Sequence, residues 1–126
     1  MIDGNTGNFF HSETTYKYPW VEVELMKVGM VHRVKIINRK NCCGDRLKNA
    51  VVRAGLSKVD ENKHGIITEN RICGNYKGPG SNGETIVINC KEAIKSRYVT
   101  LQLMNNEKST LNLAEVEVYG KGIRIS

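Results

Sequence analysis

The chain has 126 residues, of which 40% are hydrophobic and 25% are charged, and its formal net charge is +6. This length supports one domain with a real core but not two. No apolar run approaches the length needed to span a membrane, so membrane insertion is not expected. The basic residues are spread along the chain without a helix-turn-helix or zinc-finger pattern, which argues against nucleic acid as a partner. A scattered positive charge fits solubility or an anionic polysaccharide.

Short β-strands are predicted along most of the chain. Apolar residues alternate with polar ones, or β-branched residues cluster, in segments bounded by Gly and Asn. The predicted strands are Trp20–Leu25, Val28–Ile37 with Gly29 as a turn, Ala50–Ala54, Glu84–Asn89, Tyr98–Leu103 and Leu113–Tyr119. Ala93–Lys95 is expected to be at most a turn, and Gly74–Gly83 an irregular loop. Many short strands without a long amphipathic helix indicate an all-β sandwich or jelly roll.

The segment Val34–Leu47 carries the main candidate site. It starts as a β-branched strand, passes through a polar turn and reaches two adjacent cysteines, Cys42 and Cys43, which Arg39 and Arg46 bracket. Turn residues after a strand are ordinary, and an arginine on a basic protein is commonly a solvated charge. Two free thiols in an exposed loop would be an oxidation liability. The cysteines are therefore expected to bond to each other or to distant cysteines, and their adjacency disfavours a metal.

Four cysteines in a small domain indicate an oxidising compartment, and hence a secreted or extracellular protein. Four cysteines allow three connectivities, and the residues alone leave these open. Catalysis is not expected, because adjacent cysteines in a turn are poor nucleophiles. The paired carboxylates Glu22/Glu24 and Glu115/Glu117 follow strand alternation and are expected to line exposed faces.

Asn38–Arg46 resembles the sugar-binding signature of the F-type lectins, the fucolectins, in which an Arg, an Asp, two cysteines and a further basic residue follow in order. Pro19–Leu25, Arg97–Thr100 and Ala114–Tyr119 resemble other strands of that family, in the family's order. The resemblance implies a β-sandwich jelly roll of the galactose-binding-like type. It places the domain at residues 1–120, without the family's usual first strand, and leaves residues 121–126 as a C-terminal tail.

The resemblance also implies a site for L-fucose. Arg39 and Arg46 would clamp the sugar hydroxyls, the Cys42–Cys43 disulfide would pack against the ring, and Asn41 stands where the family has Asp. The further residues implied are the ligand His11 and the methyl-pocket aromatics Phe9 and Phe10. His11 also fits a second family histidine that touches no sugar, and the two phenylalanines also fit plain core positions.

Two more features follow from the resemblance alone. The expected disulfides are Cys42–Cys43 and Cys73–Cys90. Asp3 and Asn5 resemble a calcium loop, and a structural Ca²⁺ would also take Ser12, the Ala114 carbonyl and Glu115. Such an all-oxygen set suits a hard cation.

The function implied is a non-catalytic lectin for fucosylated glycans. Single-sugar sites are shallow, so useful avidity would come from a homo-oligomer or tandem copies. One alternative is a degenerate lectin-fold domain that serves as a protein-interaction or structural module. Another is a basic surface that binds anionic glycans, which salt would weaken steeply.

Overall fold

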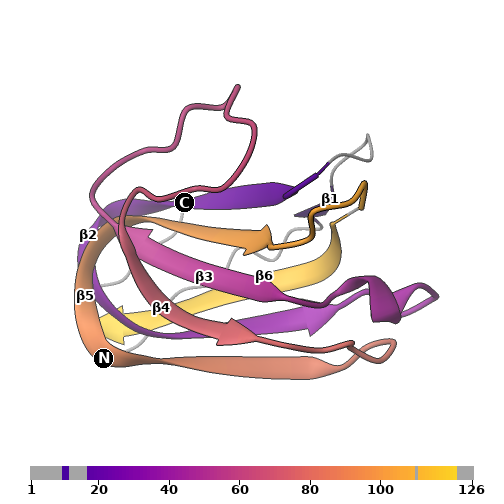
Figure 1. The fold of residues 1–126 in the computed structure, drawn as a ribbon. Helices are drawn as coiled ribbons and strands as arrows, with labels where there is room; N and C mark the ends of the chain where they lie inside the picture. Colours follow the sequence, from indigo (N-terminus) through magenta and orange to yellow (C-terminus); the bar gives the residue numbers. More distant parts are fainter. Residues whose placement is uncertain (1–9, 12–16, 110, 122–126) are drawn as a thin grey trace.

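In the computed structural model, the protein is described for residues 10–11, 17–109 and 111–121. The described strands form one antiparallel six-stranded sheet in the order β1-β6-β2-β5-β3-β4 (Figure 1). They are β1 (Phe10–His11), β2 (Trp20–Asn38), β3 (Ala50–Gly55), β4 (Arg71–Tyr76), β5 (Thr85–Leu103) and β6 (Asn112–Lys121), with a 3-10 turn, η1, at Gly44–Arg46. The all-β prediction is confirmed. No helix in this part of the chain is long and apolar enough to cross a membrane.

Two strands are far longer than the sequence pattern indicates. The predicted segments Trp20–Leu25 and Val28–Ile37 are one strand, β2, of 19 residues, so Gly29 is not a turn. The pairing of β2 with β5 shifts register between Glu24 and Gly29, and this irregularity lets the strand bend without ending. Ala93–Lys95 is likewise strand, because β5 runs unbroken through it. Figure 1 shows both strands curving at the same side of the molecule.

The bends fold the single sheet into two layers. The first half of β2 pairs with the second half of β5, which also pairs with β3, and β4 lies at the outer edge. The second half of β2 pairs with the first half of β5 on one side and with β6 on the other. The core between the layers is aliphatic. Its fully buried members include Leu25, Val31, Ile36, Leu47, Val52, Leu103, Leu113 and Val118.

Strand β4 was not predicted, and it takes Gly74–Tyr76 out of the expected irregular loop. Only Arg71–Cys73 of this strand precede the expected loop, and three residues are too few to show the alternation of apolar and polar side chains that predicts a strand. Cys73 on β4 bonds to Cys90 on the first half of β5. This disulfide therefore ties the edge strand of one layer to the other layer, as the resemblance implied.

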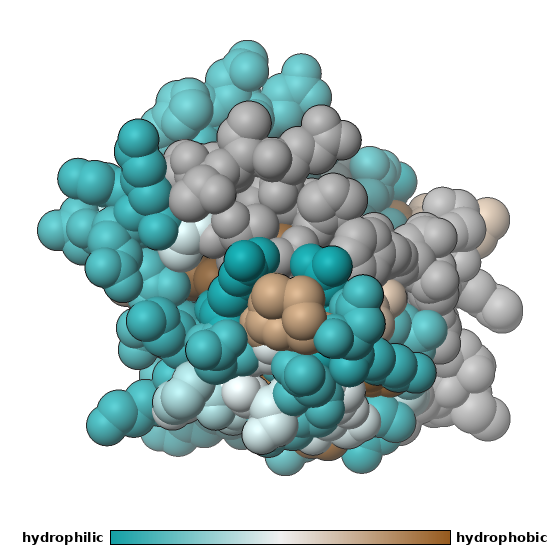
Figure 2. Space-filling model, turned by 90° about the vertical axis from the view of Figure 1, so that its right-hand side faces the viewer, coloured by the Kyte–Doolittle hydropathy of each residue, from teal (hydrophilic) through white to brown (hydrophobic). Residues whose placement is uncertain are grey.

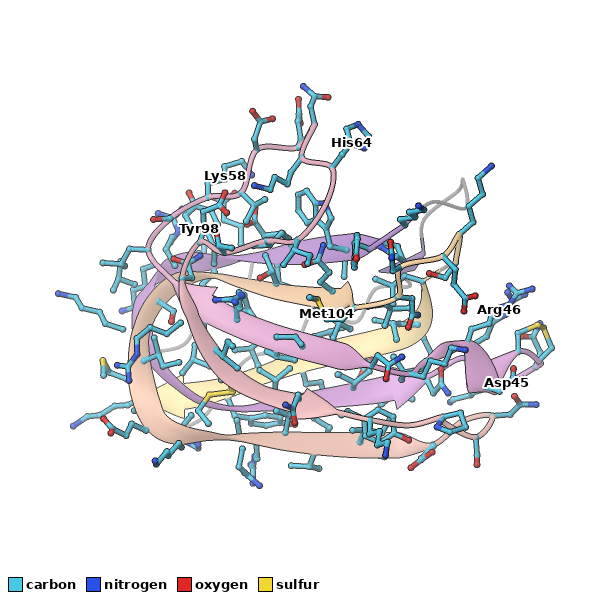
Figure 3. The ribbon with its side chains drawn as sticks, viewed as in Figure 1. Asp45, Arg46, Lys58, His64, Tyr98 and Met104 are labelled. Carbon is cyan, nitrogen blue, oxygen red and sulfur yellow. A yellow bond between two sulfur atoms is a disulfide. The ribbon has the colours of Figure 1, made fainter. Side chains whose placement is uncertain are left out.

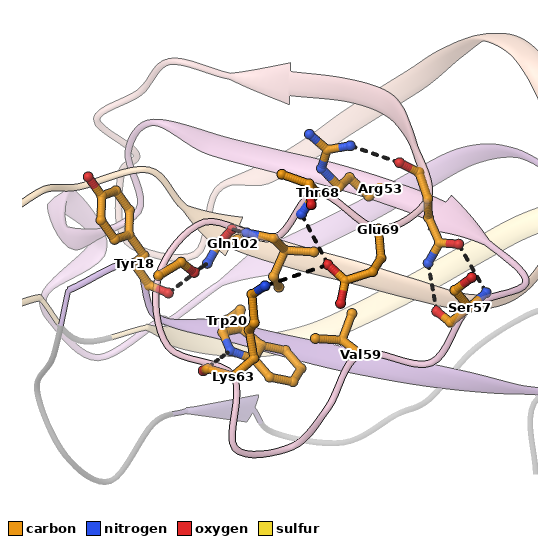
Figure 4. A network of polar contacts seen from close by, with 12 residues as sticks. Tyr18, Trp20, Arg53, Ser57, Val59, Lys63, Thr68, Glu69 and Gln102 are labelled. Atoms are coloured by element: carbon orange, nitrogen blue, oxygen red, sulfur yellow. Dashed lines mark hydrogen bonds and ion pairs between the residues drawn. The ribbon is translucent and has the colours of Figure 1, made fainter.

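The segment from residue 56 to 70, between β3 and β4, covers the outer face of the first layer (Figure 4). Val59 and Ile67 are each 1% exposed there. The Gln102 amide donates to the carbonyls of Tyr18 and Gly65 and accepts from the N–H of Ile67. This segment therefore packs as a small additional layer outside the two layers of the sheet.

Two carboxylates lie where the sequence predicts exposed faces, and both are largely buried. The Glu22 side chain is 8% exposed and accepts hydrogen bonds from the Val59 N–H and the Lys58 ammonium. Glu117 is 9% exposed. Hydrogen bonds with Glu115 and with the Tyr119 hydroxyl hold the pKa of Glu117 below its usual value. The expectation was wrong for these two residues, because loops and neighbouring side chains cover the outer sheet faces.

Candidate functional site at the cysteine loop

The candidate loop begins where β2 ends, at Asn38, and runs to the 3-10 turn η1. Cys42 and Cys43 are bonded to each other, with their Cα atoms 3.7 Å apart. Cys43 has φ +65°. The Arg46 N–H donates to the Cys43 carbonyl, and the Leu47 N–H donates to the Gly44 carbonyl. The structure therefore forms the disulfide that the resemblance implied, on a tightly turned segment at one end of the sandwich.

The buried side chain of Asn38 holds this loop through hydrogen bonds. Its side chain is 1% exposed, and its amide nitrogen donates to the carbonyls of Gly44 and Ser81, each at 2.9 Å. Its amide oxygen accepts from the Arg39 N–H at 2.9 Å. One buried amide thus fixes both ends of the cysteine turn. Buried polar groups that are fully paired in this way rigidify their surroundings.

A second loop, residues 80–84, is fastened to the first. The Gly83 N–H donates to the Arg39 carbonyl at 2.8 Å, and the Gly44 N–H donates to Asn82 Oδ1 at 2.8 Å. A Cβ atom on Gly44 would lie 2.6 Å from the Asn82 backbone nitrogen. Only glycine permits this close approach. The sequence pattern shows these glycines but not what they contact.

Glu84 supports the second loop. It accepts from the Ser81 N–H at 2.8 Å and from the Tyr76 hydroxyl at 3.3 Å. Burial, together with the charge of Glu84, raises the pKa of Tyr76 above its usual value. Asn38, Asn82 and Glu84 are the supporting residues that sequence reasoning missed, since each acts through tertiary contacts.

The two arginines differ in their surroundings. Arg39 is half-buried, and its Nε donates to Asn41 Oδ1 at 2.8 Å. Arg46 is exposed, and its guanidinium has no partner among the described residues. Asp45 is also exposed, and in Figure 3 the Asp45 and Arg46 side chains lie at the loop end of the sandwich. This end faces the viewer in Figure 2, where a small hydrophobic patch is enclosed by hydrophilic residues.

The backbone register brings β1 toward this loop. Asn38 of β2 pairs with Leu113 of β6, and Leu113 pairs with Phe10 of β1. His11 pairs with Asn112, one position further toward the loop end. Adjacent strands lie about 4.8 Å apart, so the backbones of His11 and Arg39 lie within about two strand spacings. Phe9 lies outside the described residues, and the side chains of Phe10 and His11 are not described.

Only two of the five predicted calcium ligands lie among the described residues. Ala114 and Glu115 lie on β6, directly after the residue that pairs with Phe10. Asp3, Asn5 and Ser12 lie outside the described residues. Within residues 10–11, 17–109 and 111–121, no group of three or more His, Cys, Asp or Glu side chains could hold a metal ion. The calcium site stays a prediction.

Comparisons with known proteins agree with this geometry. The family described as NedA-like, galactose-binding domain matches residues 1–101. A fucolectin of Anguilla anguilla is 34% identical over 122 residues, which cover 93% of this chain and 72% of the relative. The chain belongs to the fucolectin family, the F-type lectins. Membership accounts for the order of the cysteine loop and its flanking strands.

Solved structures of fucolectin-type domains share the fold. The F-lectin (fucolectin) from Morone saxatilis serum superposes with a TM-score of 0.74 at 30% identity, over 89% of this chain and 36% of that one. A fucose binding module of Streptococcus pneumoniae superposes with a TM-score of 0.62 at 27% identity, over 91% of this chain and 75% of that one. The jelly-roll prediction is therefore confirmed.

Proposed function

We propose that this fucolectin-family domain is a lectin that binds L-fucose-containing glycans at the cysteine loop, without catalysing a reaction. The observation that supports the proposal is the Cys42–Cys43 disulfide, which Arg39 and Arg46 flank in the sequence, on a loop whose two ends are joined by the buried Asn38 side chain. The names of the eel and bass relatives and of the pneumococcal module support fucose as the sugar.

The chemistry of the loop fits a neutral sugar. A guanidinium presents several N–H donors in a fixed plane, which suits two neighbouring hydroxyl oxygens. Arg46 has no competing partner among the described residues, and Arg39 keeps further donors beyond the one given to Asn41. The disulfide supplies an apolar surface for the ring. In this proposal His11 adds a ring-oxygen or hydroxyl contact, and Phe9 and Phe10 line the methyl pocket.

A structural Ca²⁺ belongs to the same proposal. Asp3, Asn5, Ser12, the Ala114 carbonyl and Glu115 would hold it through oxygen atoms, which calcium prefers. Ala114 and Glu115 adjoin the β1–β6 pair, so a cation there would fasten the segment around β1 to the sandwich. The ion would act on the position of His11 and not on the sugar.

We further propose that the protein acts outside the cell on fucosylated glycans, with avidity from several copies. Its two disulfides are stable in an oxidising compartment. Single-sugar affinities multiply when several sites engage one surface.

Calorimetric titration with L-fucose, with and without Ca²⁺, tests the proposal. The unmutated chain should bind saturably, and Arg39→Ala and Arg46→Ala should each weaken binding at least about tenfold, the size of one lost charged hydrogen bond. Arg71→Ala, at an exposed position on β4, is the matched control and should leave affinity unchanged. A folded chain that binds no fucose would overturn the proposal.

A further inference from the structure

The outside of the bend in β2 carries a stripe of exposed apolar side chains. Met26, Val28 and Met30 stand at alternate positions of the strand and are 59%, 43% and 37% exposed. Alternate residues of a strand point to the same face. Leu25 before the stripe and Val31 after it are fully buried in the core. The stripe therefore faces away from the core, on the outer surface of the sandwich.

Lysines stand on both sides of this stripe. Met30 pairs with Lys95 of β5 on one side and with Lys121 of β6 on the other. Directly paired residues of an antiparallel sheet place their side chains on the same face, with Cβ atoms about 5 Å apart. Lys27, Lys95 and Lys121 are exposed, and none of them forms an ion pair with another described residue. The apolar stripe is thus bordered by ammonium groups.

A second bulge adds to this surface. Between neighbouring pairs with β2, strand β5 has the four residues Cys90–Ala93 where β2 has only His32. An excess of residues on one strand makes that strand bulge out of the ladder. Lys91, Glu92 and Ala93 are all exposed. The bend thus gains a further lysine and a small apolar side chain.

Positive charge exceeds negative charge at this end of the protein. The segments 24–31 and 90–97 contain two acidic residues, Glu24 and Glu92. Arg97 holds Glu24 in an ion pair at 2.9 Å, so the charge of Glu24 is already compensated. The remaining carboxylate, Glu92, faces the four exposed lysines of the stripe and the bulge. This apolar stripe and these four lysines are called the bend patch.

The bend patch lies at the opposite end of the sandwich from the cysteine loop. Figure 1 shows β2 and β5 curving at one side of the molecule, and Figure 3 places Asp45 and Arg46 at the other. Met30 and Asn38 are eight positions apart on β2, a path of about 26 Å along the strand. A surface that binds the bend patch therefore leaves the proposed fucose site open.

The chemistry of the bend patch selects its partner. Exposed apolar side chains rimmed by charged ones mark sites of protein or membrane contact. A second copy of this chain would bring like charges together, and a single-stranded nucleic acid would find no aromatic ring in the patch to stack on. An anionic phospholipid bilayer complements both parts of the patch. Its headgroups attract lysines, and apolar side chains enter the boundary between headgroups and acyl chains.

We propose that the bend patch docks this protein on anionic phospholipid bilayers. Met26, Val28 and Met30 enter the interface, the lysines lie among the headgroups, and the chain does not span the bilayer. In this orientation the cysteine loop points away from the lipid, so one protein joins a lipid surface to a glycan on a second surface. Docking itself needs no sugar, so it stands or falls independently of the proposed function.

Sedimentation with lipid vesicles tests the docking. Vesicles with about 30% phosphatidylserine should bind the protein at least about tenfold more tightly than vesicles of phosphatidylcholine alone, because each lysine near an anionic surface contributes about fivefold. Raising the salt concentration from about 0.1 M to about 0.5 M should weaken this binding. Absence of binding to the anionic vesicles would overturn the proposal.

Two double variants of exposed side chains separate the apolar from the ionic contribution. Met26→Ser with Val28→Ser removes apolar surface, and Lys95→Glu with Lys121→Glu reverses two charges. Each double variant should weaken binding to the anionic vesicles at least about tenfold. Thermal melts check that both variants stay folded. Binding that survives the Met26 and Val28 changes but not the lysine changes would be ionic only, as for an anionic polysaccharide, and would overturn membrane docking.

Matched controls and a readout without variants complete the test. Val87→Ser and Lys108→Glu change exposed residues away from the bend and should leave vesicle binding unchanged. In anionic bicelles that carry a spin-labelled lipid, the methyl NMR signals of Met26 and Met30 should broaden. The signal of Met104, which follows β5 at the loop end, should keep its width. Equal broadening of all three signals would contradict docking through the bend.

Discussion

Arg39 donates from Nε to Asn41 Oδ1 at 2.8 Å, across the turn that leads into the cysteine pair. The bond is local, between residues two positions apart, and it joins two side chains near the surface. It holds one arginine of the proposed clamp with a neutral acceptor, at the position where the family pattern has a carboxylate. The arginine is thus braced, but without the added strength of an ionic acceptor.

Asn41→Asp should therefore strengthen fucose binding. A carboxylate makes a charge-assisted bond to the guanidinium, about twice as strong as a neutral one. The expected gain in affinity is about two- to fivefold at low salt, and it should shrink as salt screens the exposed pair. Calorimetry with L-fucose at two ionic strengths measures both effects. If Asn41→Ala binds as well as the unmutated chain, bracing by residue 41 is irrelevant.

Asn38→Ala should destabilise the domain more than any exposed change in the loop. The variant leaves the carbonyls of Gly44 and Ser81 and the Arg39 N–H without their partner in a buried place. The expected loss is about 2–4 kcal/mol of unfolding free energy. Asn82→Ala removes a single partly buried hydrogen bond, the one from the Gly44 N–H, and should cost about 1 kcal/mol. Urea denaturation ranks the two, and the reverse order would refute the anchoring role of Asn38.

The two disulfides should separate stability from binding. Cys73 and Cys90 are 17 positions apart and join the two layers, so replacing both with Ser should cost about 3 kcal/mol. Cys42 and Cys43 are adjacent and close no loop of chain, so their double Ser variant should change the melting temperature little. It should weaken fucose binding, because the apolar plate is lost. Thermal melts and titrations of both double variants check this contrast.

Glu22→Ala should loosen the segment from residue 56 to 70. The Glu22 carboxylate accepts a hydrogen bond from the Val59 N–H at 3.0 Å. Loss of the carboxylate leaves that donor unpaired, which should lower the free energy of unfolding by about 1–3 kcal/mol. Lys58→Ala should cost less, because Lys58 is exposed and surface ion pairs contribute little. Trypsin cleavage at Lys63 reports the loosening. Faster cleavage in Lys58→Ala than in Glu22→Ala would contradict this assignment.

The Glu22 contact also has a defined pH dependence. The hydrogen bond and the charge of Glu22 raise the pKa of Lys58 above its usual value. A raised lysine pKa means that the stabilisation is fully present below the ordinary lysine value of about 10.4 and is lost only as the pH rises through the folded-state pKa. The difference between Lys58→Ala and the unmutated chain should therefore be constant at neutral pH and vanish in strong alkali.

Local pattern was sufficient for the fold class. Apolar and polar residues alternate along Trp20–Leu25 and Leu113–Tyr119, and this alternation shows which side chains can face a core. The signal is local, because it involves only neighbouring residues. Local pattern also marked the adjacent cysteines as a candidate site, but it did not decide whether they bond to each other or to distant cysteines. Resemblance to the F-type lectins added both pairings, Cys42 with Cys43 and Cys73 with Cys90, which the residues alone leave open.

Tertiary structure alone decided the rest. The bends that make β2 and β5 single strands depend on pairing between segments far apart in sequence, so Gly29 and Ala93–Lys95 read locally as breaks. Glu22 is buried by contacts with a segment distant in sequence. Asn38 likewise joins the loops at Gly44 and Ser81 only after the chain has folded. Sequence thus determined which residues prefer strand and core, because those preferences are local. Folding determined which polar side chains became buried, because the partners of those side chains lie far away in the sequence.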